Sequence, residues 1–494
     1  MHRRARLALA ATWGLMGAGA LVVPGAVAQP ATLDAATTRV AAAEPPALSI
    51  RRVAPSVRVE KYGKRVYLDL GAFLVAGDQP VEARTVRPAY TQPLRSTIHV
   101  GDEAFAVPAN FVPSFEGARL VRITLRTPAG KVVSTRTASL CSGGDGGSVR
   151  ARPDAPDVSP YGHCYGYNPL ALGSVHGLQA GWAMSLASGR GVELPLGRYV
   201  AEVSIRGVFR KMLGLPAGSS ATTIGVRVVR GEDECHGCAD GSSRAADTGD
   251  PAVSSRPDRT ARTLTEAPEG APLPDLRSLP AFGIQMHRGR WLAFGANVWN
   301  AGASPLVVDG FRREGEDVMD AYQYFYDAQG NPAGRVPTGT MEWDERDGHM
   351  HWHFLDFARY RLLDADKQAI VRSRKEAFCL ANTDAIDYTL PEANWNPYNT
   401  DLHSACGGYG SIAVREVLDV GSGDTYAQFR PGQSFNVADL PAGKYFIEVT
   451  GNPTRNLAES NTTNNTAYRP VWITGKPGEP RKVRVRPVGL VDIE

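Results

Sequence analysis

The sequence predicts an all-β protein, and three observations support this fold class. The chain of 494 residues contains 52 glycines and 35 prolines, a composition rich in turn-forming residues. No long stretch repeats its apolar residues with the period of an α-helix. Instead, glycine, proline and aspartate separate short alternating or β-branched runs, as in β-sandwiches. Because so long a chain exceeds one ordinary core, we expect an N-terminal β-sandwich joined by a polar linker to a second, sandwich-like β-domain.

The N-terminus resembles an export signal. Three arginines among the first six residues precede the uncharged, mostly apolar stretch 7–23, and Ala26-Val27-Ala28 is a small-x-small cleavage motif. We therefore predict a signal peptide over residues 1–28 and a secreted, extracellular protein. A retained membrane anchor is the alternative, but the stretch is shorter than the roughly 20 residues that span a bilayer. General secretory export and twin-arginine export both remain open.

Charge and hydropathy argue against two classes of partner. The 54 basic and 51 acidic residues leave a net charge of +3, too little for the concentrated basic field that neutralises phosphates. We therefore expect no nucleic-acid partner. No later segment is long and apolar enough to cross a bilayer, so we expect no membrane association after signal cleavage.

Composition divides the rest of the chain into five segments. They are a mobile leader (29–50), an N-terminal β-sandwich domain of unknown function (51–232), a polar linker (233–272), a second β-domain (273–474) and a C-terminal tail (475–494). The strands expected in the first domain are 57–60, 66–70, 120–125, 199–205 and 223–229. Those expected in the second are 291–297, 360–363, 414–418, 445–449 and 467–473.

One short sequence motif occurs in both predicted β-domains. Residues 194–199 (LPLGRY) and 440–445 (LPAGKY) each place a Pro-x-Gly turn ahead of an alternating strand. The recurrence supports two β-domains without proving a duplication.

The six cysteines suggest disulfides in an oxidising compartment. Six cysteines allow fifteen full pairings, and the sequence alone does not choose among them. Nearness along the chain favours Cys141–Cys164, Cys235–Cys238 and Cys379–Cys406. The Cys235–Cys238 loop is also compatible with a redox pair or, through His236, a metal site. The aromatic segment 161–167 around Cys164 is either a disulfide-pinned turn or a binding loop.

The strongest local signal is a run of histidines at every second position: His349, His351 and His353. On an extended strand these side chains share one face, with neighbours about 6.6 Å apart, and a curve or bulge is needed to bring all three to one ion. Trp352 and Phe354 should pack on the opposite face. Three imidazoles suit copper or zinc, and Cu(II) binds such ligands most tightly. The motif predicts a metal site but not its reaction, and an exposed polar strand face is the alternative.

The residues around this motif resemble the lysyl oxidase family. Five motifs occur in that family's order across residues 273–474. They are the histidine strand, the following YRLLD strand, a Lys-x-x-Phe-Cys-Leu segment, an Asp-x-Tyr motif and a closing strand. In this sequence they are 349–354, 360–364, 375–380, 424–426 and 452–465. A Gly348 stands where animal members have a cysteine, and this domain holds fewer cysteines than theirs, as in bacterial and fungal members.

The resemblance implies a copper-dependent amine oxidase. His349, His351 and His353 would bind Cu(II), and Lys375 and Tyr426 would together form the family's lysine tyrosylquinone cofactor. The substrate would be a primary amine, either peptidyl lysine, free lysine or a small amine. O2 would be consumed, and an aldehyde, ammonia and hydrogen peroxide would be released.

Two points stay open at the level of sequence. The general base is unassigned, with His403, Asp401 and Asp356 as candidates because they lie near the motif in the chain. The principal alternative function is a non-catalytic extracellular copper-binding β-sandwich protein. A zinc hydrolase is less favoured, because no glutamate adjoins the histidines in an HExxH-like arrangement.

Overall fold

The structure is a computed structural model. It describes residues 45–141, 148–162, 164, 168–187, 191–231, 261–327, 330–345, 350–372, 377–396, 406–428 and 432–490. Residues from Pro45 onward form one compact unit. The predicted signal peptide, the Cys235–Cys238 loop and most of the predicted linker lie outside the described residues. Within the described part, no helix has the length and apolar character needed to cross a membrane.

The all-β prediction is confirmed. Among the described residues the helical elements are the short α1 (Gly207–Met212) and the 3-10 turns η1 (Ala109–Phe111) and η2 (Ala217–Ser219). The strands before the predicted linker are β1 (Leu48–Arg52), β2 (Ser56–Tyr62), β3 (Arg65–Val66), β4 (Ala72–Ala76), β5 (Val81–Val86), β6 (Arg95–Val100), β7 (Glu103–Val107), β8 (Val121–Arg126), β9 (Val132–Ala138), β10 (Ser148–Arg150), β11 (Gly173–Leu178), β12 (Trp182–Ser185), β13 (Val192–Glu193), β14 (Gly197–Ile205) and β15 (Ala221–Arg230).

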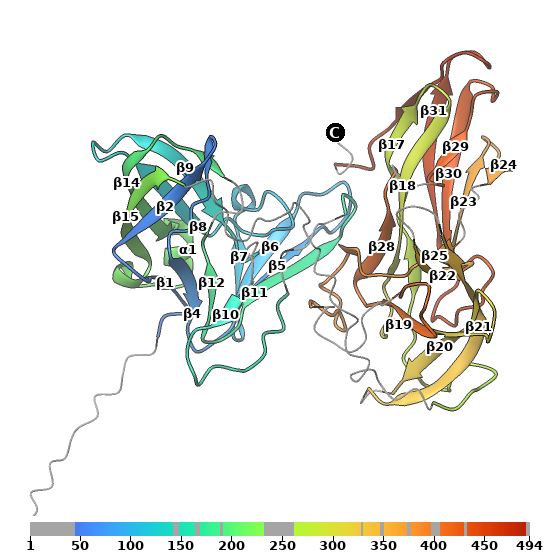
Figure 1. Ribbon diagram of the computed structural model, residues 1–494, viewed down its shortest axis with the longest axis horizontal. Helices are drawn as coiled ribbons and strands as arrows, with labels where there is room; N and C mark the ends of the chain where they lie inside the picture. Colours follow the sequence, from blue (N-terminus) through green and yellow to red (C-terminus); the bar gives the residue numbers. More distant parts are fainter. Residues whose placement is uncertain are drawn as a thin grey trace, which may run out of the picture. The chain divides into compact units, whose positions relative to one another are not determined.

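The strands after it are β16 (Leu276–Ser278), β17 (Phe282–His287), β18 (Trp291–Asn300), β19 (Leu306–Arg312), β20 (Val318–Tyr326), β21 (Pro332–Asp344), β22 (His351–Leu355), β23 (Ala358–Leu363), β24 (Ala369–Arg372), β25 (Ala377–Phe378), β26 (Asp384–Ala385), β27 (Ala413–Leu418), β28 (Ser422–Tyr426), β29 (Ser434–Asn436), β30 (Gly443–Gly451), β31 (Thr466–Thr474) and β32 (Lys482–Val485). Figure 1 labels many of them.

Each sheet draws its strands from one half of the chain. In the N-terminal half (residues 45–231) the orders are β1-β4-β12-β10, β11-β5-β6-β7 and β13-β3-β2-β15-β14-β8-β9. In the C-terminal half (residues 261–490) they are β16-β18-β28-β26, β25-β22-β21-β20-β19-β27 and β24-β23-β30-β31-β32, with β17 and β29 also pairing β18. The two sets of strands expected from the sequence thus form separate sheets, whereas the predicted domain boundaries remain a prediction.

Most predicted strands occur where the alternation placed them, for example 199–205 inside β14 and 467–473 inside β31. The predicted strand 66–70 is wrong beyond Val66. Leu68 and Leu70 are buried there without sheet pairing, and Gly71 follows at φ 55°. The alternation of buried and exposed residues over 66–70 therefore predicted a strand where the backbone beyond Val66 forms no sheet hydrogen bonds.

The repeated Pro-x-Gly-x-Tyr motif adopts the same local structure in both halves of the chain. The Tyr199 hydroxyl donates to the Pro195 carbonyl at 2.9 Å, and the Tyr445 hydroxyl donates to the Pro441 carbonyl at 2.7 Å. Each tyrosine thereby fixes the turn to the strand that follows it, β14 in one half and β30 in the other. Tyrosines that bond a carbonyl a few residues upstream recur at the corners of β-sandwiches.

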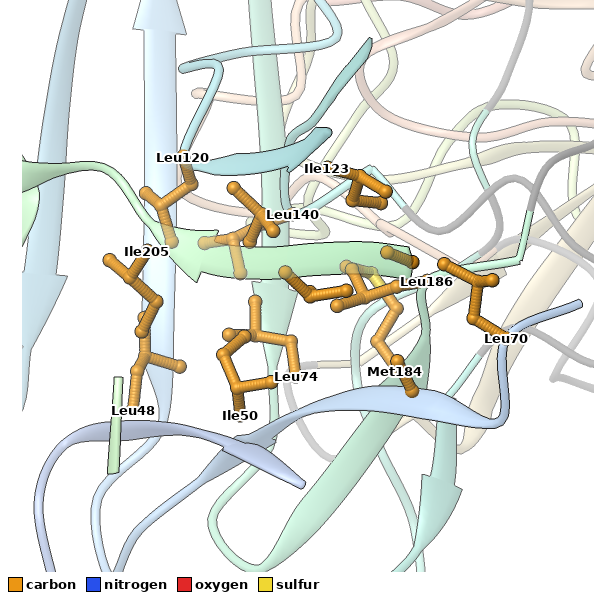
Figure 2. Packing of buried hydrophobic residues seen from close by; sticks show 14 of the residues in the cluster. Leu48, Ile50, Leu70, Leu74, Leu120, Ile123, Leu140, Met184, Leu186 and Ile205 are labelled. Carbon is orange, nitrogen blue, oxygen red and sulfur yellow. The ribbon is translucent and has the colours of Figure 1, made fainter. Parts of the chain in front are cut away.

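Each half has its own main apolar core. In the N-terminal half, inward-facing residues of β1, β4, β8, β12 and β14 pack together, and Figure 2 shows Leu48, Ile50, Leu74, Ile123, Met184 and Ile205 among them. The core of the C-terminal half is more aromatic, with Phe294, Trp352, Phe354, Tyr360 and Phe378 buried together. This aromatic core holds the strands that carry the predicted site.

Candidate active site

The histidine strand is β22, at the inside of a six-stranded sheet. It pairs antiparallel with β21, so that His351 lies opposite Asp344 and His353 lies opposite Glu342. The imidazole rings of His351 and His353 have their centroids 4.7 Å apart. Trp352 and Phe354, at the alternate positions, are buried in the aromatic core, as predicted. Their burial fixes the strand, and the two imidazoles share its other face.

Asp344 orients one of these imidazoles. Its Oδ2 lies 3.3 Å from Nδ1 of His353, and both side chains are almost completely buried, at 9% and 2% exposure. A carboxylate at Nδ1 keeps the proton on that nitrogen and leaves the lone pair on Nε2, the nitrogen that can bind a metal ion. Metal-binding histidines are commonly held in this way. The donor chemistry of the pair therefore fits a copper or zinc ion.

The third predicted ligand, His349, lies outside the described residues. Met350, with φ 22°, is the first described residue before β22. Within the described part of the chain, no three histidine, cysteine, aspartate or glutamate side chains come close enough to hold an ion. The three-histidine site therefore stays a prediction, of which the structure describes two members.

Tyr426 ends strand β28, which pairs with β18 and β26. Its ring packs edge-on against Phe378, with centroids 4.8 Å apart. Its hydroxyl donates to the Cys379 carbonyl at 3.3 Å. Lys375 lies outside the described residues, but it precedes Phe378 by only three positions in the sequence. The structure thus brings Tyr426 against the segment that directly follows Lys375.

The same segment also borders the histidine strand. β25 pairs antiparallel with β22, placing Phe378 opposite Phe354. The predicted disulfide between Cys379 and Cys406 is present, and the Cys406 carbonyl accepts the Trp352 backbone N–H at 3.1 Å. The predicted Cys141–Cys164 disulfide is present as well. Three segments distant in the sequence, β22, β25 and β28, therefore meet through Phe378.

Comparison with known proteins identifies a family for this part of the chain. The family described as Lysyl oxidase matches residues 325–477, the segment that contains β22, β25 and β28. Residues 325–477 belong to the lysyl oxidase family. The match begins later than residue 273, where the resemblance read from the sequence begins.

Three relatives of this lysyl oxidase domain come from vertebrates. Lysyl oxidase homolog 2 of Xenopus tropicalis is 29% identical over 134 residues, which are 26% of this chain and 15% of the relative. Lysyl oxidase homolog 4 of Mus musculus is 29% identical over 132 residues, 26% of this chain and 16% of the relative. Protein-lysine 6-oxidase of Homo sapiens is 30% identical over 135 residues, 27% of this chain and 28% of the relative. The chain therefore matches less than a third of the length of each.

The lysyl oxidase domain buries two acids near Tyr426. Glu416 on β27 is completely buried, and its Oε2 accepts the Leu380 backbone N–H at 2.9 Å. Burial, together with the charge of Asp424, raises the pKa of Glu416 well above its usual value. Asp424 is itself buried and lies two residues before Tyr426, on the same face of β28.

The environment of Tyr426 favours its neutral phenol. Burial raises the pKa of Tyr426 well above its usual value, and the charges of Asp424, Tyr360 and Glu416 raise it further. A phenol that loses electrons must also lose its proton, and a carboxylate beside it can accept that proton. Asp424 and Glu416 are the acids whose charges act on this phenol.

The candidates for the general base are not resolved. Asp356 lies in the turn between β22 and β23, with φ 58°. His403 and Asp401 lie outside the described residues. Sequence analysis missed Asp344 and Glu416. Glu416 left a signal, because it and Arg415 are charged residues inside the predicted strand 414–418, whereas Asp344 is identified only through its cross-strand register with β22.

Proposed function

We propose that this chain is a secreted, copper-dependent amine oxidase whose quinone cofactor forms from Lys375 and Tyr426. The observation that supports it best is the meeting of β22, β25 and β28, with Tyr426 against Phe378 and Cys379. The substrate is a primary amine, of the class that includes peptidyl lysine, free lysine and small amines. The products are an aldehyde, ammonia and hydrogen peroxide.

Each residue of the site has a role that its chemistry supports. His349, His351 and His353 would hold the copper, and Asp344 fixes the ring of His353. When present, copper and quinone supply the oxidation of the amine with O2 as the electron acceptor.

The other residues hold the tyrosine and its proton. The edge contact with Phe378 and the hydrogen bond to the Cys379 carbonyl restrict the ring of Tyr426. Glu416 and Asp424 supply buried carboxyl groups that can exchange a proton with the phenol.

The test is a visible absorption spectrum of the secreted protein after copper loading in air, before and after phenylhydrazine. We expect a quinone band that shifts to a stable adduct, and peptide mass spectrometry that finds Lys375 and Tyr426 cross-linked. A copper-loaded protein with no quinone band and no peroxide from amines would instead be the non-catalytic copper-binding protein. Preferential zinc binding with hydrolytic activity would refute both interpretations.

A further inference from the structure

The aromatic segment around Cys164 has partners in the C-terminal half. The ring of Tyr161 stacks on that of Trp395, with centroids 5.7 Å apart and the planes 6° from parallel. The Tyr161 hydroxyl donates to Oε2 of Glu82 at 3.2 Å, and the guanidinium of Arg84 lies 5.9 Å from the Trp395 ring centre. The Cys141–Cys164 disulfide fixes the chain close to Tyr161. Tyr161 therefore joins strand β5, which carries Glu82 and Arg84, to Trp395 of the C-terminal half.

Backbone hydrogen bonds continue this contact. The N–H groups of Leu172 and Gly173 donate to the Ile386 carbonyl at 2.6 and 3.0 Å, and the Tyr388 N–H donates to the Gly173 carbonyl at 3.1 Å. Gly173 and Asp387 thereby form a parallel bridge. A Cβ atom at Gly173 would overlap Oδ1 of Asp387, so a side chain there would force this carboxylate away from the Thr389 N–H and hydroxyl whose hydrogen bonds it accepts.

An apolar cluster lies beneath these hydrogen bonds. Leu170 is completely buried and packs with Leu279, Phe282, Trp299 and Ile386. Leu170 belongs to the N-terminal half, and the other four belong to the C-terminal half. Such a cluster excludes water from the hydrogen bonds above it, which strengthens them.

Asn168 carries the contact to the strand of Tyr426. Its side chain is 3% exposed, and its Nδ2 donates to Oδ2 of Asp384 at 3.0 Å and to Oγ1 of Thr425 at 3.2 Å. Its Oδ1 accepts the Leu170 N–H at 2.9 Å, so both ends of the amide are used. The Thr425 hydroxyl also donates to Asp384 and accepts from Asn297 Nδ2. Thr425 directly precedes Tyr426.

We propose that Tyr161 and residues 168–173 dock the N-terminal half onto β28, β26 and the residues that follow β26 as far as Trp395, and that Asn168 is a positioning residue for Tyr426. Side chains alternate along β28, so Thr425 faces Asn168 while Asp424 and Tyr426 face the other side. Holding Thr425 fixes the register of the strand and hence the place of the Tyr426 ring against Phe378. The docking does not depend on the proposed function, whereas its consequence for the quinone does.

Two substitutions in the full-length protein test the docking, each with a matched control. Asn168→Asp keeps the shape but replaces the donating amide by an acceptor facing the Asp384 carboxylate. Gly173→Ala introduces the Cβ that overlaps Asp387. The controls are Asn110→Asp, at an exposed asparagine, and Gly218→Ala, where an added Cβ meets no heavy atom within 4 Å.

The first measurement is amide hydrogen exchange. We expect the N–H groups of Leu172, Tyr388 and Thr425 to exchange about tenfold faster in both test variants, and at the wild-type rate in both controls. Unchanged exchange in Asn168→Asp and Gly173→Ala would overturn the docking. Faster exchange at Leu172 and Tyr388 with unchanged exchange at Thr425 would overturn the positioning role of Asn168.

The second measurement is the rate of quinone formation per bound copper. Asn168→Asp should slow it several-fold at unchanged copper content, because the proposed ligands His351 and His353 are on a different strand, β22. An unchanged rate would refute the positioning role. If wild-type protein forms no quinone, the proposed function fails, and the exchange of Leu172, Tyr388 and Thr425 still decides the inference.

Discussion

The two halves of the chain bury ionisable groups to very different extents. Among the described residues of the N-terminal half, the buried acidic, basic and histidine side chains are Glu82 and His176. The C-terminal half buries many more, namely Asp275, Asp309, Asp344, His353, Arg415, Glu416, Asp419, Asp424, Glu448, Arg469 and Arg481. Both halves are built of mainly antiparallel sheets around apolar cores, so the fold class does not explain the difference.

Burial of charge costs free energy unless partners compensate it. Some of these groups have clear structural partners, as in the bidentate contact of Arg415 with Asp309 at 2.6 Å for both hydrogen bonds. Others, such as Asp344, Glu416 and Asp424, lie around the histidine strand and Tyr426. The C-terminal half therefore loses more folding free energy to the burial of charged groups than the N-terminal half does. Some of these buried groups lie at the proposed site, so part of this loss is explained by the proposed function.

The largest expected effect separates a reacting tyrosine from a structural one. Tyr426→Phe should abolish quinone formation and peroxide release while copper stays bound, because the ring then lacks the oxygen that becomes part of the quinone. Tyr199→Phe, in the N-terminal half, removes a comparable hydroxyl-to-carbonyl hydrogen bond and should leave both signals unchanged. Visible spectra and a peroxide assay measure the outcome. Residual oxidase activity in Tyr426→Phe would show that the cofactor assignment is wrong.

The next effect compares a buried ion pair with an exposed one. Asp309→Ala leaves Arg415 charged and buried, so the free energy of unfolding should fall by about 3–5 kcal/mol. Glu202→Ala breaks the exposed pair with Arg126 in the N-terminal half and should cost at most about 1 kcal/mol. Urea unfolding followed by tryptophan fluorescence gives both values. Equal losses would contradict the assigned difference between the halves.

The sequence predicted those parts of the site that depend on local spacing. The period of two in residues 349–353 identified the β22 strand and the burial of Trp352 and Phe354, because alternation is a local property. Nearness along the chain identified the Cys379–Cys406 disulfide in the same way. The resemblance to the family also brought out Tyr426, which no spacing rule distinguishes from other tyrosines.

Features that depend on register between distant strands were not predictable. Asp344 orients His353 only because β21 and β22 pair in one particular register. Asn168 reaches Thr425 across 257 positions of sequence, and no local pattern in either segment indicates the other. The strand expected at 66–70 failed for the complementary reason, since burial of Leu68 and Leu70 gives alternation without pairing.

The buried acid Asp419 gives the C-terminal half a distinctive pH dependence. Burial raises the pKa of Asp419 from 3.8 to about 7, although the amide of Asn382 donates to its carboxyl at 2.8 Å. The protonated form is favoured in the folded state, so its contribution to stability is full below pH 3.8 and is lost as the pH rises towards 7. Asp419→Asn should make this slope shallower and stabilise the protein by about 4 kcal/mol at pH 8, while the buried Glu416 keeps its own contribution of the same sign. Urea unfolding at pH 5 and pH 8 measures it, and a slope as steep as that of the wild type in the variant would exclude Asp419 as a source.

The buried His176 of the N-terminal half should give the opposite slope. Burial lowers its pKa from 6.5 to about 4, and its Nε2 lies 3.0 Å from the Phe115 carbonyl, which accepts a hydrogen bond from the neutral ring. The unfolded chain binds the proton more readily, so stability is full above pH 6.5 and falls by about 3 kcal/mol as the pH drops to 4. His176→Gln keeps a donor and removes the titration, so unfolding free energies at pH 4.5 and pH 7 should differ less than in wild type. Combining His176→Gln with Asp419→Asn should change both slopes independently, because the two groups have different hydrogen-bond partners, the Phe115 carbonyl and the Asn382 amide. If one substitution changed the slope assigned to the other, the two halves would share one titrating network and the contrast drawn here would be wrong.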